Sequence, residues 1–448
     1  MATEWDSSSL LSFDGGGIRG YASLCILEEL MNRIGVIEGD PEKLQNLFER
    51  EPRERQPETS EAQSSFHPHI SPFQQQLDIP FLPCHYFDYI IGASTGGLIA
   101  IMLGRFRMSV DQAKAQYEQL GNTVFGFPRI FHYRSPLFAT RCKFSAKRLA
   151  TAVNVVANKH GGGRVAETLH QGISFKSDPD LCKTLVVAHV EVYGQSTGPS
   201  KVMDSAHIFR PYDLTAAGGP MARNPGYACE LPVQVVARAT TAAPTYFKPE
   251  EIKVPGGETW RFKDGGMRAN NPTEEGKREV EYRAGKKPDF VVSIGTCSRN
   301  GPLFTGHPRG GGLRDTLNVV WDAIRRLTDP VRIHESMYND YRKVIPGYFR
   351  FDDQTSDEWK DIKMDDWKGD RQNGPGSKTL NQIKALVNDY ARDNEDIINR
   401  CAEQLVRRRR LRALNEGMWE RNRDDLKQHL KTHPVDVECF EEQRWAWA

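Results

Sequence analysis

The sequence predicts an α/β protein with a mainly parallel central sheet, in a three-layer arrangement whose helices cover both faces. Two observations support this class. Up to about residue 350 of the 448-residue chain, short apolar segments alternate with segments of helical hydrophobic spacing, which is typical of strand–helix–strand units. Two of the apolar segments also end in glycine-rich turns that lead into helices, as turns of α/β folds do.

The expected elements begin with a short buried strand at residues 10–13. A helix follows, because the next apolar residues recur at helical spacing. A second strand over 86–91 leads into a helix over 98–103. Further expected elements are a helix over 110–120 and strands over 184–190, 207–209, 260–262 and 290–294.

Changes in composition divide the chain. We expect a main domain over residues 8–350 and a mainly helical extension over 351–448. Within the main domain, residues 39–80 break the alternation, and the stretch 49–65 contains a single apolar side chain. A segment this polar buries too little surface to offset the entropy lost on ordering. We therefore expect 39–80 to be an insertion that is disordered or acts as a lid.

The composition excludes several functions. The 60 basic and 59 acidic residues give a net charge of +1, which provides no field for binding nucleic acid. The cysteines are scattered and the histidines unclustered, so neither a disulfide framework nor a metal site is expected. One uncharged run stands out, residues 89–104, but it is shorter than the roughly 18 residues of a membrane span. We expect a cytoplasmic protein without metal or cofactor.

The segment Gly92-Ala93-Ser94-Thr95-Gly96 matches the pattern G-x-S-x-G. A serine in a sharp turn between a strand and a helix has a strained backbone, so the residues two before and two after it must be small. Gly92 and Gly96 stand at those positions. The turn exposes the hydroxyl at a helix N-terminus, where developing negative charge is favoured. The pattern and its flanking elements make Ser94 a candidate nucleophile.

Two further segments offer chemistry. In Asp14-Gly15-Gly16-Gly17-Ile18-Arg19-Gly20, between a strand and a helix, three successive glycines leave backbone N–H groups accessible to an anion. That anion is a phosphate or the oxyanion of acyl transfer, and the spacing matches neither common nucleotide-binding pattern. Asp264 follows a β-like stretch and precedes two glycines, so its carboxylate can lie at a strand end. Asn271 is expected to cap a helix that starts at Pro272.

Together and in this order, the three segments resemble the patatin-like phospholipase family, in the form of fungal, calcium-independent phospholipase A2-like proteins. Residues 237–247 and 292–296 are also similar to segments of that family. The resemblance covers about residues 8–350. It implies a modified α/β-hydrolase fold and a lipid acyl hydrolase that forms an acyl-enzyme intermediate.

The resemblance also assigns roles to residues. It implies that Ser94 is the nucleophile and Asp264 its general base, without a catalytic histidine. Arg19 would help to position the glycine loop. The substrate implied is a phospholipid or another acyl lipid, so contact with a membrane surface is expected, while no protein partner is indicated. The oxyanion hole would consist of the amides of Gly15, Gly16 and Gly17.

Two other functions stay open. An ordinary α/β-hydrolase esterase would use Ser94, Asp264 and a later histidine such as His307 or His334, in a chain order that suits that class. That class does not predict the glycine loop, however. A lipid-sensing or interaction module with a weak site is the other alternative, and the presence of both Ser94 and Asp264 disfavours it.

The basic run Arg407–Arg410 in the expected extension has two interpretations. It contacts anionic lipid headgroups, or it is the solvent-exposed face of a helix, because Leu405 and Leu411 flank it at helical spacing.

Overall fold

The computed structural model describes most of the chain. Most of the expected insertion, residues 50–80, and the candidate His307 lie outside the described residues, as does the chain after residue 413. The described residues are 8–49, 81–128, 142–160, 168–169, 172–178, 181–194, 201–214, 223–254, 257–297, 330–342, 347–370 and 373–413.

The centre of the fold is an eight-stranded sheet with the order β10-β9-β1-β2-β5-β8-β7, in which β6 also pairs with β5. Neighbours from β10 to β5 are parallel, whereas β6 and β8 are antiparallel to β5, and β7 to β8. The expected α/β class is confirmed. The strands are β1 (Ser9–Phe13), β2 (Tyr89–Ala93), β5 (Lys183–Tyr193), β6 (Lys201–Phe209), β7 (Glu250–Lys253), β8 (Thr259–Lys263), β9 (Phe290–Ile294) and β10 (Tyr348–Phe351), with a separate pair β3 (Thr168–Leu169) and β4 (Gly172–Ile173).

Helices complete the fold. Short 3-10 helices occur at Gly17–Arg19, Pro83–His85 and Asp357–Asp361, and a π turn at Ile101–Arg105 continues α3. The α-helices are α1 (Gly20–Glu38), α2 (Pro41–Glu49), α3 (Thr95–Ala100), α4 (Val110–Val124), α5 (Ala146–His160), α6 (Val233–Thr240), α7 (Gly266–Ala269), α8 (Thr273–Ala284), α10 (Pro330–Tyr341), α11 (Ser377–Asp393) and α12 (Glu395–Ala413).

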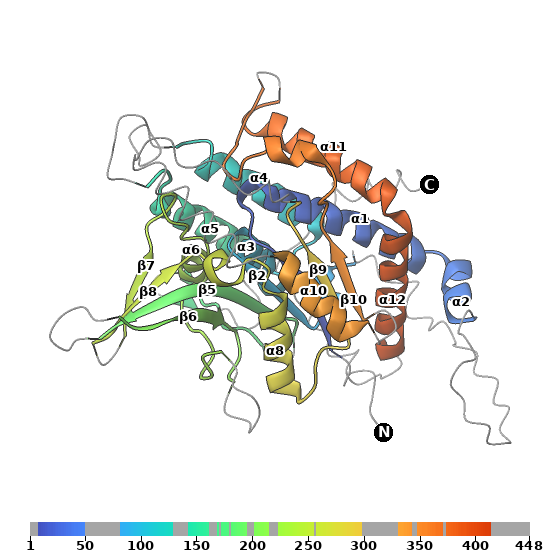
Figure 1. Cartoon of the computed structure of the whole chain (residues 1–448), viewed down its shortest axis with the longest axis horizontal. Coiled ribbons are helices and arrows are strands. Elements are labelled where there is room, and N and C mark those ends of the chain that lie inside the picture. Colours follow the sequence, from blue (N-terminus) through green and yellow to red (C-terminus); the bar gives the residue numbers. More distant parts are fainter. Residues whose placement is uncertain are drawn as a thin grey trace.

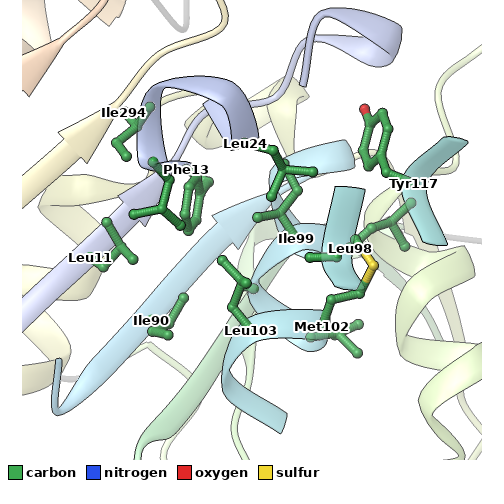
Figure 2. Close-up of a cluster of buried hydrophobic side chains, with 14 of the residues drawn as sticks. Leu11, Phe13, Leu24, Ile90, Leu98, Ile99, Met102, Leu103, Tyr117 and Ile294 are labelled. Carbon is green, nitrogen blue, oxygen red and sulfur yellow. The ribbon is translucent and has the colours of Figure 1, made fainter. Parts of the chain in front are cut away.

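The helices form a layer on each face of the sheet (Figure 1). Successive residues of a strand point to opposite faces. Leu11 and Phe13 of β1 therefore join the larger buried cluster with α1, α3 and α4, whereas Leu10 joins the cluster beneath α8 and α10. Figure 2 shows part of the larger cluster, in which Leu24 and Ile99 lie beside Phe13. The buried apolar strands hold the sheet between the two layers.

The C-terminal helices share this core. α11 and α12 lie against α1, and their apolar residues, such as Ile383 and Val406, belong to the same cluster as β1. The expected extension is helical over α11 and α12. Its separation from a main domain over 8–350 stays a prediction.

The basic run on α12 points inward, which neither sequence interpretation anticipated. Arg409, 6% exposed, donates to Glu38 at 2.7 Å, and Arg410 donates to the same carboxylate at 2.6 Å. The guanidinium of Arg407 lies over the ring of Phe48 and that of Arg408 over Phe290. The run therefore contributes to packing against α1, α2 and β9, because buried guanidinium groups require a carboxylate or an aromatic face.

Several boundaries differ from the expected ones. The strand expected at 86–91 starts at Tyr89, because Pro83 opens a 3-10 helix and the N–H of Tyr86 donates to the Pro83 carbonyl at 3.0 Å. The first part of the expected insertion is helical: α2 buries Leu44 in the core. α8 starts at Thr273, one residue later than expected, although the side-chain oxygen of Asn271 still accepts from the Thr273 N–H at 3.1 Å.

In the part of the chain that the structure describes, no helix combines the length and the apolar character that a membrane crossing requires.

Candidate active site

Ser94 occupies the turn between β2 and α3, at the edge where the parallel strands end. Its φ of 55° and ψ of −126° lie in a region that residues with a side chain rarely adopt. Thr240 of α6 holds this backbone. Its hydroxyl accepts from the N–H of Ser94 at 2.9 Å and donates to the carbonyl of Val187 at 2.6 Å. The strained turn is thus anchored to the neighbouring strand β5.

The glycines on either side of this turn are required by space. A Cβ atom on Gly92 would overlap the carbonyl of Gly96, and one on Gly96 would overlap the carbonyl of Phe13 in β1. Glycine therefore lets the turn close tightly against both strands. This is the steric reason that the sequence pattern indicated.

Strand β8 brings Asp264 to Ser94. Lys263, the last residue of β8, pairs with His189 of β5. Two residues earlier, β5 pairs with Ala93 at the end of β2, so the residues that follow β8 and β2 meet across β5. The Ser94 hydroxyl donates to Oδ2 of Asp264 at 2.7 Å, a distance suited to proton transfer.

The carboxylate of Asp264 is buried without a cation. Its exposed fraction is 6%, and among the described residues no basic side chain forms an ion pair with it. Burial raises the pKa of Asp264 to about 6, against the opposing hydrogen bonds from Ser94 and from the Gly266 N–H at 2.8 Å. At neutral pH the group is therefore ionised, yet it is a stronger base than an exposed aspartate.

The glycine loop starts at the same edge of the sheet, after β1. Here the structure differs from the expectation for Gly15, whose N–H donates to the carbonyl of Asn270 at 3.0 Å and so holds the loop in place. The Gly16 N–H donates to the hydroxyl of Thr95 at 3.2 Å, a partner that can rotate. The Gly17 N–H donates to no group within the described residues. The donors that can face an oxyanion are those of Gly16 and Gly17.

Asp14, the first residue of the loop, pairs with an arginine that the sequence analysis missed. Arg350 of β10 donates to both oxygens of Asp14, at 3.0 and 2.6 Å, and to Asp352 at 2.7 Å. Asp14 and Arg350 are 336 residues apart, and no sequence signal linked them. Arg19, which was expected to position the loop, is 8% exposed and lines the cavity described next.

An apolar cavity of about 130 Å³ opens beside the Ser94 hydroxyl and the carboxylate of Asp264. One face of α4 forms a wall of it, because its residues there recur at helical spacing. The segment after β10 closes the cavity with Met364. The apolar lining comes from Leu98, Leu120, Val124, Phe125, Leu149, Ala243, Phe247, Pro330 and Met364.

His334, one of the two candidate histidines of the alternative mechanism, does not line this cavity. None of the described residues that line the cavity is a histidine. His334 of α10 instead lies 3.1 Å from the hydroxyl of Tyr348, and Asp264 uses its two oxygens for Ser94 and Gly266. His307, the other candidate, lies outside the described residues.

One histidine does lie among acids, which the sequence analysis did not expect. Ligand atoms of His189, Glu191 and Asp204 lie within 4.8 Å of one another. Lys263 donates to Glu191 at 2.8 Å, and Arg268 pairs with Asp204. Both carboxylates thus already face a cation, so the group is an ion-pair network and a poor site for a divalent metal.

The fold and this site define the class of protein. A serine on a strained turn, a buried aspartate and a nearby pair of glycine amides beside an apolar cavity are the geometry of a serine esterase on an α/β fold. Comparison with known proteins then identifies the family. The model of the patatin-like phospholipase family matches residues 75–276, which include Ser94 and Asp264 but not the glycine loop. Residues 75–276 thus form a domain of the patatin-like phospholipase family.

Individual relatives agree with this match. The chain is 26% identical to phospholipase A I of Arabidopsis thaliana in an alignment of 375 residues that covers 75% of this chain and 26% of that protein. It is 25% identical to human calcium-independent phospholipase A2-gamma in an alignment of 371 residues that covers 81% of this chain and 41% of that protein. The cGAMP-activated phospholipase of Escherichia coli (strain TW11681) is 25% identical in an alignment of 300 residues that covers 65% of this chain and 62% of that protein. The chain thus spans less than half the length of the first two relatives.

Proposed function

We propose that this protein is a lipid acyl hydrolase of the phospholipase A type. The proposal depends on one observation above all: the 2.7 Å hydrogen bond from the Ser94 hydroxyl to the buried Asp264, beside an apolar cavity. The patatin-like phospholipase domain over residues 75–276 and relatives named as phospholipases support it. The substrate is a fatty acyl ester of a membrane lipid.

The chemistry runs in two steps. As the oxygen of Ser94 attacks the ester carbonyl, Asp264 accepts the hydroxyl proton. The tetrahedral oxyanion receives hydrogen bonds from the N–H groups of Gly16 and Gly17. When the intermediate collapses, the departing alcohol takes the proton from Asp264, and the acyl group stays on Ser94. Water then attacks the acyl-enzyme with Asp264 as base again, which releases the fatty acid and restores the serine. Neither step calls for a metal ion.

The shape of the cavity suits a single acyl chain. Leu120 and Val124 of α4, and Phe125 directly after it, contribute apolar side chains to the lining. From Tyr117 to Phe125 the helix rises about 12 Å, and the lining along this path is largely apolar. A fatty acyl chain bound along α4 would bury its methylenes there, while its ester carbonyl lies at Ser94.

The setting of the protein is part of the proposal. The described cysteines are free thiols, as in reducing compartments, which supports a cytoplasmic location. Because the substrate resides in a membrane, we infer peripheral contact with the bilayer. Phe127, which follows α4 near the cavity wall and is 62% exposed, is a side chain suited to that contact. Residues 8–350 would carry the reaction and 351–448 would brace it.

The test measures fatty-acid release from mixed phospholipid vesicles in the presence of a chelator. Ser94→Ala and Asp264→Asn are each expected to lower the rate by at least about a thousandfold. Ser109→Ala is the control, because that serine caps α4 and does not line the cavity. Wild-type rates in either site variant would show that the assigned pair does not carry the reaction.

The same assay distinguishes the two alternative functions, a Ser–Asp–His esterase and a lipid-sensing module. A Ser–Asp–His esterase predicts that His307→Ala or His334→Ala abolishes turnover, whereas the proposed pair predicts near-normal rates for both. A lipid-sensing module predicts that the wild type binds vesicles but releases no more fatty acid than Ser94→Ala.

A further inference from the structure

The peptide groups on either side of the Gly16–Gly17 peptide are each held at both ends. In the Gly15–Gly16 peptide, the carbonyl accepts from the hydroxyl of Thr296 at 3.4 Å, and the N–H donates to the hydroxyl of Thr95 at 3.2 Å. A peptide group is planar. Hydrogen bonds to its carbonyl and its N–H therefore define the orientation of the whole plane.

The Gly17–Ile18 peptide is held in the same way by two distant segments. The hydroxyl of Tyr117, on α4, donates to the Gly17 carbonyl at 2.6 Å. The N–H of Ile18 donates to the carbonyl of Met364, in the segment after β10, at 3.0 Å. Burial raises the pKa of Tyr117, so the hydroxyl stays protonated and remains a donor.

The peptide between these two carries the N–H of Gly17, which donates to no other described residue. The φ of Gly17 is +61°, and a Cβ on it would overlap the Met364 carbonyl. We propose that Tyr117 is a positioning residue: with Met364, it orients the loop so that the Gly17 N–H is ready to donate to the oxyanion before substrate binds. This inference rests on the proposed function.

A second feature of the loop supports this role. Gly20 ends the glycine motif, and a Cβ on Gly20 would lie 2.5 Å from the Tyr117 hydroxyl and 3.2 Å from that of Thr95. Its φ of −55° is open to any residue. The glycine is therefore needed for space and not for backbone freedom, and the space is occupied by the two hydroxyls that hold the loop.

The test is Tyr117→Phe, which removes the hydroxyl and keeps the ring. We expect kcat to fall about tenfold, the effect of one ordinary hydrogen bond, with KM unchanged. A lipid trifluoromethyl ketone, which forms an oxyanion on Ser94, should bind about tenfold more weakly. An ether lipid of the same chain length, which forms none, should bind as it does to the wild type.

Tyr21→Phe is the matched control. Tyr21 neighbours Tyr117, with ring centroids 6.3 Å apart, and its hydroxyl donates to Glu118 at 2.6 Å. Tyr21→Phe loses a hydroxyl hydrogen bond whose acceptor, the Glu118 carboxylate, lies outside the loop, so its kcat should match the wild type. Gly20→Ala provides a second perturbation, which displaces the Tyr117 hydroxyl and should lower kcat in the same direction if Tyr117→Phe fails to fold.

Different outcomes overturn different statements. Full kcat in Tyr117→Phe beside an inactive Ser94→Ala overturns the positioning role alone. Equal weakening of the ketone and the ether lipid does so too, because the hydroxyl would then only shape the cavity. Equal rates for the wild type and Ser94→Ala overturn the proposed function, and the positioning role with it.

Discussion

Two acids, the partly exposed Asp88 and the buried Asp264, lie near opposite ends of strand β2 in different electrostatic settings. Asp88 stands before the strand, where Arg412 of α12 donates to its two oxygens at 3.1 and 2.7 Å. Burial raises the pKa of Asp88, but the charge of Arg412 and the N–H of Ser9 outweigh it, and the pKa lies below its usual value. At the other end of β2, Asp264 has no such cation, and burial raises its pKa to about 6.

The difference shows how one sheet separates stability from chemistry. At the amino end of the strand, carboxylates meet arginines from α12, and the C-terminal helix is held to the core. At the carboxyl end, the acid forms no ion pair with any described residue, and it is positioned to act as a base toward a serine on a strained turn. Chemistry at the carboxyl ends of parallel strands is typical of open α/β sheets. The following predictions test this division.

The largest effect on stability is expected at the amino end. Glu38→Gln removes the buried carboxylate that accepts hydrogen bonds from both Arg409 and Arg410, and with it the negative charge that faces their two guanidinium groups. We expect a loss of about 3–5 kcal/mol in the free energy of unfolding, measured by urea denaturation. Fatty-acid release per folded molecule should stay unchanged, because Glu38 does not line the cavity. A loss below about 1 kcal/mol would contradict the prediction.

At the carboxyl end, a change that abolishes activity should increase stability. The native pKa of Asp264, about 6, exceeds its unfolded value of 3.8, so the native state binds the proton more tightly. This group therefore lowers the free energy of unfolding as pH rises from about 4 to about 6, by roughly 3 kcal/mol in all. The Asp264→Asn variant has no carboxylate to titrate, so it does not lose this stability. Its free energy of unfolding should match that of the wild type near pH 4 and exceed it by roughly 3 kcal/mol at pH 8.

The same titration governs activity. Ionised Asp264 is the base, so kcat/KM of the wild type should fall about tenfold per pH unit below about pH 6. Chemical denaturation and initial rates over pH 4–8 measure the two effects together. If the Asp264→Asn variant is no more stable than the wild type at pH 8, burial does not destabilise the ionised carboxylate, and the prediction is wrong.

The smallest effect on stability is expected for an ion pair that is exposed to solvent. Arg33 of α1 pairs with Glu395 of α12 at 3.0 Å, with the side chains 38% and 51% exposed. This ion pair joins α1 to α12, as the hydrogen bonds of Glu38 to Arg409 and Arg410 do, but it is exposed to solvent. Arg33→Gln should cost about 0.5 kcal/mol or less, because exposed ion pairs are weak. If Arg33→Gln lowers the free energy of unfolding as much as Glu38→Gln does in the same urea titration, burial is not the reason that the two interactions differ in strength.

Predictions from the sequence were most accurate where the groups that restrict a residue lie close to it in the chain. Gly92 and Gly96 could be explained in advance, because the crowding they avoid arises within one turn and the adjacent strand. The predictions were less accurate for Gly15, since the group that engages its N–H, the carbonyl of Asn270, is distant in the chain. They missed Arg350 for the same reason.

The sequence by itself determined the α/β class, the strained serine turn and the glycine loop, because hydrophobic periodicity and backbone sterics act over a few neighbouring residues. Only the tertiary structure decided which groups meet. It set Ser94 against an acid 170 residues away and turned the basic run of α12 toward Glu38. It also left Gly17 as the unengaged amide of its loop within the described residues. Such contacts depend on the order and register of the strands, which arise from many weak contacts summed over the whole core.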